Sequence, residues 1–470
     1  IAAHPSNPTD FNDMAALVGL DAVRDAILPP GPEETDETDD YYPPQAHNDD
    51  APYTALGYSK GVYYYLPAST GQIVALTAPA HTKTQMIALC GLDWLERRFP
   101  AQQSSFDTDT AADHLITAAH RAGVFFASRL RGRGAWTDEG RIVHNVGDCI
   151  MVDGQPPELD FKSRFIYQRD APLNTGAAPL SNKRAHEFYD LCRFLPFENP
   201  MDAMLLAGWC VCAHIGGALV WRPHLWITGR FGSGKSHVVS RIIKPILGDN
   251  MIFVMSVSTE AGIRQELGGD ALPVLFDEIE GKDAYDQGRI QRVLDLMRQS
   301  SSDTGGKIIK GTQGGRSMSF EIRSCFCFSS INASLVQQSD KSRVCVIEAA
   351  QEYQRLPFEE LLGMENTLLT PDYIGGFYSR AVRLAPVIRK NSAIFADVVA
   401  TRLGARRAGD QYGTLLAGLY SLFSNKEIKH DAAAEWCAGQ DWLKISEEVA
   451  AQSDEAKLWD FLMQSVIRQG

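Results

Sequence analysis

The segment His224–Leu247, HLWITGRFGSGKSHVVSRIIKPIL, restricts the possible folds of this chain more than any other stretch. A short strand-like run, LWIT, leads into a glycine-rich loop, and a helix-like pattern follows. The residues that complete the pattern G-x-x-x-x-G-K-[ST] are Gly229, Gly234, Lys235 and Ser236. Glycines in this pattern let successive backbone N–H groups turn toward phosphate oxygens. The succession of strand, loop and helix therefore predicts a nucleotide-phosphate site at the positive N-terminus of the helix.

Each residue of this loop has an expected task. Lys235 would reach the β- and γ-phosphates, and the Ser236 hydroxyl would be a ligand of Mg²⁺. The residues expected to line the nucleotide are Gly229, Gly232, Ser233, Gly234, Lys235, Ser236 and His237. The alternative is a glycine-rich turn that binds nothing, but the strand-like and helix-like flanks favour the phosphate site. ATP and Mg²⁺ are therefore the expected cofactors.

A second strand-like run, LPVLFDEIEG, places Asp277 42 residues after Lys235. Its apolar residues predict a strand that ends at two carboxylates. Asp277 would hold the Mg²⁺ shell, and Glu278 would polarise the attacking water as a general base. A surface turn could also contain FDE, but its position downstream of a complete phosphate loop favours a site that hydrolyses ATP.

A third strand-like run, SCFCFSSIN, ends at Asn332. We expect this strand to lie beside the first two, so that Asn332 can orient the water against the γ-phosphate. Eleven residues later, Arg343 opens another apolar run after the polar stretch QQSD. This is where an arginine that completes a neighbouring subunit's site would be carried, and a surface charge is the alternative.

These four features, packed into residues 229–343, resemble the AAA+ ATPases. The compact spacing is similar to that of the superfamily 3 helicases. Phrases such as RPHLWITGRFGSGKS and STEAGIRQELGGDALPVLFDEIEG resemble the helicase portion of phage, prophage and plasmid primase-helicases, over most of residues 53–420. The resemblance implies an α/β P-loop core with helices on both faces of a parallel sheet. It also implies a homo-oligomer, with a hexameric ring expected, that couples ATP hydrolysis to unwinding of single-stranded or forked DNA in replication.

In such ATPases a β-hairpin between the Asp-Glu strand and the Asn strand projects into the pore of the ring. The segment GGKIIKGTQGGRSMSFEIRS, Gly305–Ser324, has two strand-like runs around a glycine-rich tip. Lys307, Lys310 and Arg316 on or near this tip are expected to bind DNA backbone phosphates without reading bases. A solvated hairpin is the alternative.

The chain divides by composition into five expected parts. They are the tail of an upstream module (1–28), an acidic proline-rich linker (29–52), a collar-like α+β domain (53–184), the AAA+ core (185–350) and a helical domain (351–470). The start TDFNDMAALVGLDAV is similar to the end of a TOPRIM-type primase module. Because the first residue is Ile1, we expect a piece of a longer polypeptide that includes a primase.

The net charge of −13 argues against a generally basic nucleic-acid coat, but it leaves room for a local basic channel. The apolar stretch 205–221 is at the short limit for a membrane span and contains His214, so we expect a buried helix, no membrane partner and a cytoplasmic protein. The nine cysteines include no CxxC pair, and we expect free, mostly buried thiols.

Three questions stay open from the sequence. The segment RLRGRG, with Arg129, Arg131 and Arg133, fits a nucleic-acid backbone contact or, better, a solvated basic turn. Arg407 and Arg406 compete as the arginine of a lid domain. The ATP-site motifs do not separate a DNA helicase from an AAA+ machine that remodels a protein or acts as an NTP-dependent switch, and the basic hairpin favours DNA.

Overall fold

The computed structural model of the chain describes residues 51–451, apart from 159–160, 177, 256, 280–282, 303–320, 334 and 336. Within these residues lies a five-stranded sheet of order β10–β11–β12–β9–β13, in which all neighbouring strands are parallel. Its strands are β9 (His224–Thr228), β10 (Ile252–Met255), β11 (Val274–Asp277), β12 (Phe326–Ser329) and β13 (Val344–Glu348). This confirms the predicted α/β P-loop-like core.

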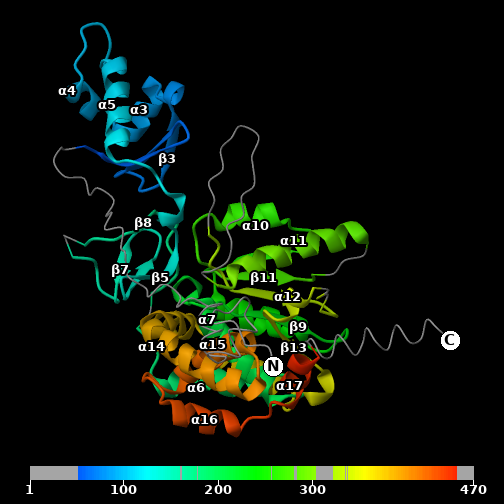
Figure 1. The fold of residues 1–470 in the computed structure, drawn as a ribbon. Coiled ribbons are helices and arrows are strands. Elements are labelled where there is room, and N and C mark those ends of the chain that lie inside the picture. The colour runs from blue at the N-terminus through cyan, green and yellow to red at the C-terminus, as the bar shows by residue number, and fades with distance from the viewer. Residues whose placement is uncertain are drawn as a thin grey trace, which may run out of the picture. The chain divides into compact units, whose positions relative to one another are not determined.

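The other elements precede, interrupt and follow this sheet (Figure 1). The other strands are β1 (Tyr53–Ser59), β2 (Val62–Pro67), β3 (Val74–Thr77), β4 (Leu130–Arg131), β5 (Gly134–Asp138), β6 (Arg141–Asn145), β7 (Ile150–Val152) and β8 (Ile166–Tyr167). The α-helices are α3 (Lys83–Cys90), α4 (Leu92–Arg98), α5 (Thr108–Arg121), α6 (Asn182–Cys192), α7 (Pro200–Ala213), α8 (Lys235–His237), α9 (Lys244–Leu247), α10 (Glu260–Leu267), α11 (Ala284–Ser300), α12 (Gln338–Lys341), α13 (Phe358–Leu368), α14 (Pro371–Leu403), α15 (Arg406–Phe423), α16 (His430–Ala438) and α17 (Leu443–Ala450).

Helices cover both faces of the parallel sheet. Successive side chains of a strand point to opposite faces, so each strand contributes to two separate cores. Leu225 and Ile227 of β9 join a large core with apolar residues of α7, α14 and α15. Trp226, between them, joins a second core with residues of α10 and α11. Strands buried on both faces read as continuous apolar runs, which is why LWIT and VLF stood out in the sequence.

A buried helix in the apolar stretch 205–221 is confirmed as α7, but this helix spans Pro200–Ala213 and ends well before residue 221. It packs closely on α15, since a Cβ on Gly208 would lie 2.0 Å from the Leu415 carbonyl oxygen and a Cβ on Gly418 would lie 2.5 Å from the Gly208 oxygen. Small residues at these crossings let the two helices approach. Over the described residues, no helix combines the length and apolarity that a membrane crossing requires.

The N-terminal part of the described chain holds an antiparallel sheet, β1–β2–β3, and the helices α3 to α5. Strands and helices together agree with the α+β composition predicted for residues 53–184, and the apolar spacing of residues 82–99 is typical of one amphipathic helix. The structure instead breaks this helix at Gly91, whose φ of +76° lies in the left-handed region. Glycine adopts that conformation without the Cβ penalty, so Gly91 can end α3 and begin α4.

The RLRGRG segment is not a solvated turn. Arg131 is 4% exposed, and its guanidinium lies 5.0 Å from the ring centre of Trp136. Arg133 forms an ion pair of 2.7 Å with the buried Asp270, which lies just before β11. A Cβ on Gly132 would lie 2.1 Å from an Asp270 carboxylate oxygen, so the glycine permits this close approach. The solvated turn favoured from the sequence is therefore wrong for Arg131 and Arg133.

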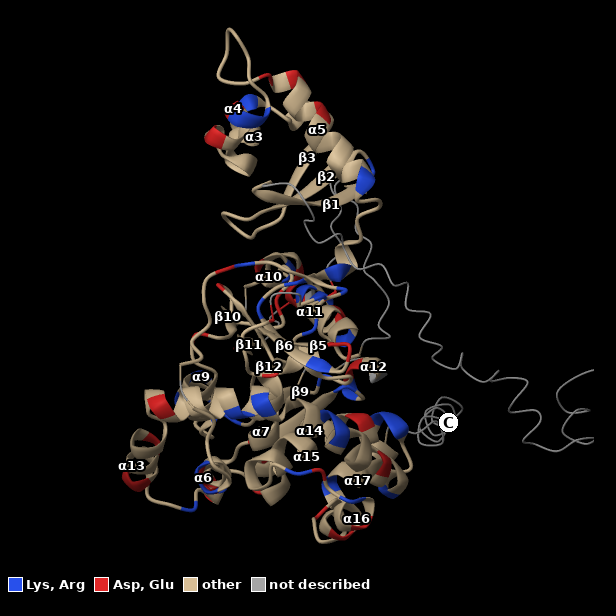
Figure 2. Ribbon diagram, turned by 90° about the vertical axis from the view of Figure 1, so that its left-hand side faces the viewer, with Lys and Arg blue, Asp and Glu red and all other residues tan. Residues whose placement is uncertain are grey.

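The C-terminal part is helical, as predicted, and α14 continues through Pro386 for 33 residues. Gly409 and Gly413 of α15 approach the backbone of Ala396 in α14. Figure 2 shows acidic and basic positions side by side on α15 and α17. All nine cysteines are free thiols, and all except Cys149 are buried.

Candidate functional site

The glycine-rich loop that is predicted to bind phosphate, here called the phosphate loop (residues 229–234), joins β9 to α8, and this confirms the expected order of strand, loop and helix. Gly229, Gly232 and Gly234 have φ angles of +144°, +77° and +95°, a region that disfavours other residues. A Cβ on Gly229 would also lie 2.2 Å from the Ala349 carbonyl oxygen, so this position has no room for a side chain. The loop therefore has the backbone conformation and the close approach for which the motif requires glycine.

Lys235 points back over this loop. Its ammonium donates a hydrogen bond of 3.1 Å to the Arg230 carbonyl and another to the Gly229 carbonyl. The charge therefore lies at the loop itself, where it can meet a phosphate oxygen. Phe231, at the tip of the loop, is 97% exposed.

The helix after the loop contains an irregular turn. Residues Val238–Ile243 form a π-helix between α8 and α9. Pro245 in α9 has no N–H, and a proline ring clashes with the carbonyl four residues earlier in a regular α-helix, here that of Arg241. The wider π turn relieves this conflict, and such turns are frequent at functional sites.

A buried carboxylate fixes this helix to the C-terminal helical region. Glu365 of α13 is 1% exposed. One of its oxygens lies 2.5 Å from His237 Nε2, and the other accepts a hydrogen bond of 3.2 Å from Arg241. His237 thus faces α13, which the sequence did not indicate, because Glu365 lies 128 residues away.

The ends of β9 and β12 are joined by two backbone hydrogen bonds. Ser330 N donates to the Ile227 oxygen at 3.2 Å, and Gly229 N donates to the Ile331 oxygen at 3.3 Å. The loop that carries Asn332 is therefore bonded directly to the start of the phosphate loop.

The two predicted carboxylates lie at the carboxyl end of β11: Asp277 is its last residue, and Glu278 follows it. Asp277 is half-buried and accepts a 3.0 Å hydrogen bond from the backbone N–H of Glu278. Glu278 is exposed and has a φ of +55°, which costs on the order of 1 kcal/mol for a residue with a side chain. The next residue, Ile279, is buried and donates to the Ser329 oxygen at 2.9 Å. Fixed neighbours on both sides thus hold Glu278 in this strained conformation, with its side chain exposed.

The predicted neighbourhood of the three strands is confirmed, since β12 lies between β9 and β11. The predicted end of the third strand is wrong: β12 ends at Ser329, before Asn332. The Ser330 hydroxyl donates to the Asn332 carbonyl and accepts from Trp226 Nε1, both at 2.7 Å. These two bonds turn the chain out of the sheet and leave Asn332 exposed.

Arg343 lies at the opposite edge of the sheet, where the amino ends of the parallel strands meet, because it immediately precedes the first residue of β13. The next residue, Val344, is paired in parallel with His224, the first residue of β9. The phosphate loop follows the last residue of β9, about 16 Å further along the strands. This separation exceeds the reach of an arginine side chain, so Arg343 cannot contact a group bound at the glycine-rich loop of the same chain.

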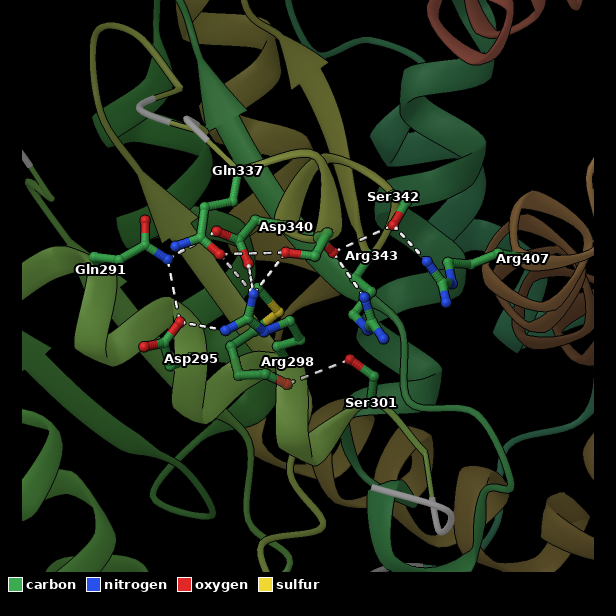
Figure 3. A network of polar contacts seen from close by, with 11 residues as sticks. Gln291, Asp295, Arg298, Ser301, Gln337, Asp340, Ser342, Arg343 and Arg407 are labelled. Atoms are coloured by element: carbon green, nitrogen blue, oxygen red, sulfur yellow. Dashed lines mark hydrogen bonds and ion pairs between the residues drawn. The ribbon is translucent and has the colours of Figure 1, made fainter. Parts of the chain in front are cut away.

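Arg343 is one of three neighbouring arginines (Figure 3). It donates to the Ser339 carbonyl at 2.8 Å, and Arg407 donates to the Ser342 hydroxyl at 3.2 Å. Burial lowers the pKa of Arg343, and the nearby Arg407 and Arg298 lower it further. Of the two lid candidates, Arg407 thus lies beside Arg343, whereas Arg406 pairs with Asp397 and Asp410.

A cavity of about 280 Å³ lies beside the phosphate loop. Arg230, Phe231, Glu198 and Tyr353 contribute to its lining. Glu198 and Tyr353 could not be predicted from the sequence, because only the folded chain brings the segments before α7 and after β13 to this loop. The hydrogen bond from Ala350 N to the Pro196 oxygen, 2.8 Å, joins those segments.

Several predicted features lie outside the described residues. They are the tail 1–28, most of the linker 29–52, and the hairpin residues Lys307, Lys310 and Arg316. Their expected roles stay predictions.

No protein-family model and no curated protein matches the chain. Among solved structures, the chain is similar to the apo A form of the NrS-1 C-terminal region, with a TM-score of 0.34, 12% identity, and coverage of 73% of this chain and 74% of that chain. It is also similar to the apo A form of NrS-1 CTR(305–718), with a TM-score of 0.29, 10% identity, and coverage of 57% and 76%. TM-scores of this size support no inference, so the proposals below depend on this chain's own residues.

Proposed function

We propose that this chain is an ATP-dependent DNA helicase or translocase, working as a hexameric ring in the replication of a phage or mobile element and forming part of a primase-helicase. One observation carries the proposal. The phosphate loop and Arg343 lie at opposite edges of the same sheet, so a site that contains both needs two subunits. A closed ring supplies such a pair at every interface.

The residues at the carboxyl edge of the sheet fit ATP and Mg²⁺. The loop glycines have the positive φ angles that the phosphate-binding motif requires, and Ser236 and Asp277 offer oxygen ligands of the kind that Mg²⁺ prefers. When bound, this ion neutralises charge on the β- and γ-phosphate oxygens.

The proposed reaction is hydrolysis of the γ-phosphate. Glu278 takes a proton from water as the water oxygen attacks the γ-phosphorus, and Asn332 orients that water. The bond from phosphorus to the β–γ bridging oxygen breaks, so ADP and phosphate leave. Lys235 and the neighbour's Arg343 stabilise the charge on the transferring group.

The DNA part of the proposal is supported by the sequence of the hairpin. Lys307, Lys310 and Arg316 surround a glycine-rich tip in a chain of net charge −13. Positive charge on a projecting loop is what non-specific binding to a phosphate backbone requires.

The experiment that tests the proposal measures ATPase activity with and without single-stranded DNA, together with unwinding of a forked duplex. We expect DNA to stimulate ATPase and ATP to drive unwinding, with Lys235→Ala as the inactive control. ATPase activity that does not change when DNA is added would favour the alternative function, in which the protein remodels another protein. A particle that stays monomeric with ATP and DNA would contradict the ring.

A further inference from the structure

Helix α11 connects the two edges of the parallel sheet. It begins a few residues after Glu278, and its 17 residues span about 25 Å. Beyond its end, the Ser301 hydroxyl lies 3.1 Å from His224 Nε2, at the start of β9. Val293, Leu294 and other residues on one side of α11 are buried against the sheet. One rigid element thus runs from the predicted general base to the edge that carries Arg343.

The last turn of α11 holds the short helix α12 through Arg298 (Figure 3). One guanidinium nitrogen donates to the Gln337 side chain at 2.7 Å and to the Ser339 hydroxyl at 2.5 Å. The same nitrogen lies 3.5 Å from a carboxylate oxygen of Asp340, and the other terminal nitrogen pairs with Asp295. Arg298 therefore joins its own helix to three residues of the α12 region.

Asp340 makes this connection specific. Its side chain is fully buried, and its second oxygen accepts a hydrogen bond of 2.9 Å from Gln291, which lies on α11 about two turns before Arg298. A buried carboxylate that lost one of these partners would keep an uncompensated charge. The position of α12 on α11 is therefore strongly preferred over neighbouring ones.

Arg343 depends on α12 for its own position. Its backbone N–H donates to the Asp340 carbonyl at 2.9 Å, and its guanidinium donates to the Ser339 carbonyl at 2.8 Å. A displacement of α11 along the sheet would therefore move α12, and with it Arg343.

From these contacts we infer that Arg298 is a positioning residue that couples one subunit's Asp277–Glu278 edge to the Arg343 it presents to the next subunit. The inference rests on the proposed function, because it requires Arg343 to act on a neighbour. It goes beyond that function by assigning the link between successive ATP sites to α11.

The test compares Arg298→Gln with Arg292→Gln, which removes an exposed arginine of the same helix. We expect Arg298→Gln to lower kcat about 10²-fold, the size of effect that a small misplacement of a reacting group produces, and to leave KM for ATP within about twofold. Arg292→Gln should match the wild type. Wild-type kcat in Arg298→Gln would overturn the inference.

A mixing experiment separates positioning of the neighbour's site from damage to the subunit's own site. Arg298→Gln subunits keep an intact phosphate loop, and Lys235→Ala subunits keep an intact Arg343 with its support. Mixed rings should regain activity at interfaces where the intact phosphate loop of an Arg298→Gln subunit meets the supported Arg343 of a Lys235→Ala subunit. If Arg343→Ala with Lys235→Ala regains activity while Arg298→Gln with Lys235→Ala does not, the inference fails and the proposed function stands. If neither mixture regains activity although subunits exchange, both fail.

Arg298→Lys protects the test against misfolding. Lysine keeps the charge, but a single ammonium cannot reproduce the planar fork that contacts Asp295 and the α12 region together. We expect a kcat between the values of the wild type and Arg298→Gln, and an unchanged melting temperature. Mixing with Lys235→Ala subunits should restore activity as it does for Arg298→Gln. A loss of kcat that mixing does not restore would overturn the inference.

Discussion

Arg343 and Lys235 lie at opposite edges of one parallel sheet. Arg343 precedes the first residue of β13, and Lys235 begins the helix that follows β9. Since these adjacent strands are parallel and in register from Val344 and His224 onward, one subunit cannot bring the two side chains to the same phosphate. The pair therefore defines two different surfaces of the molecule, and each surface can be tested by substituting its own residue.

Replacing Lys235 by alanine should abolish ATP turnover, because the charge held over the phosphate loop is lost. Glu278→Gln should still bind ATP and hydrolyse it about 10²- to 10⁴-fold more slowly, since water loses its base while Asp277 stays. Nucleotide binding and phosphate release, measured on both variants, check this. Normal turnover by Glu278→Gln would show that another group acts as the base.

Arg343→Ala should bind ATP normally but lower kcat by about 10³-fold or more, the range for an arginine that stabilises the transferring phosphoryl group. Mixed with Lys235→Ala subunits, it should regain part of the activity, because some interfaces then pair an intact loop with an intact arginine. Arg292→Gln is the matched control. Absence of any recovery in rings that demonstrably contain both subunits would argue against a role in trans.

The local parts of the site could be predicted from the sequence, because short apolar runs and glycine positions determine them. The phosphate-binding motif and the strand that ends at Asp277 followed from patterns within each segment, and the position of β12 between β9 and β11 followed from the P-loop arrangement that these motifs resemble. The end of β12 did not, since the bonds of Ser330 to Trp226 and Asn332 turn the chain early.

Contacts between distant segments could not be predicted from one sequence. The Glu365 contact to His237 and the Arg133 contact to Asp270 each join residues more than a hundred positions apart. The three arginines of RLRGRG indicated a solvent-exposed turn, but its glycines allow a close approach to the segment that contains Asp270. The network around Arg298 was missed for the same reason.

The protein should lose stability as the pH falls from about 6.5 toward 4. Burial lowers the pKa of His144 to about 4, and its Nε2 lies 2.6 Å from the Tyr378 hydroxyl. The unfolded chain takes up this proton near pH 6.5 and the folded chain only near 4, so acid favours unfolding, by at most about 3 kcal/mol at this site. Melting temperatures between pH 4.5 and 8 measure the effect.

His144→Gln provides the control for this pH dependence. The variant should melt below the wild type at pH 8, because the geometry with Tyr378 is altered, and the gap should narrow as the pH is lowered. Burial lowers the pKa of His214 to about 4 as well, so part of the acid sensitivity should remain. A gap that stays constant with pH would show that His144 is not responsible.

Lys307 and Lys310 should couple ATP hydrolysis to DNA, because they flank the glycine-rich tip of the segment between the Asp-Glu strand and the Asn strand. Replacing both by alanine removes two potential phosphate contacts, and each should reduce the magnitude of the log-affinity versus log-salt slope by about 0.7 for single strands. Basal ATPase should survive, because Lys235, Asp277 and Glu278 are unchanged. DNA-stimulated ATPase and unwinding should therefore fall together, and Lys426→Ala in the exposed loop before α16 is the matched control. Wild-type unwinding with an unchanged salt slope would mean that these lysines do not contact DNA and would favour a protein substrate.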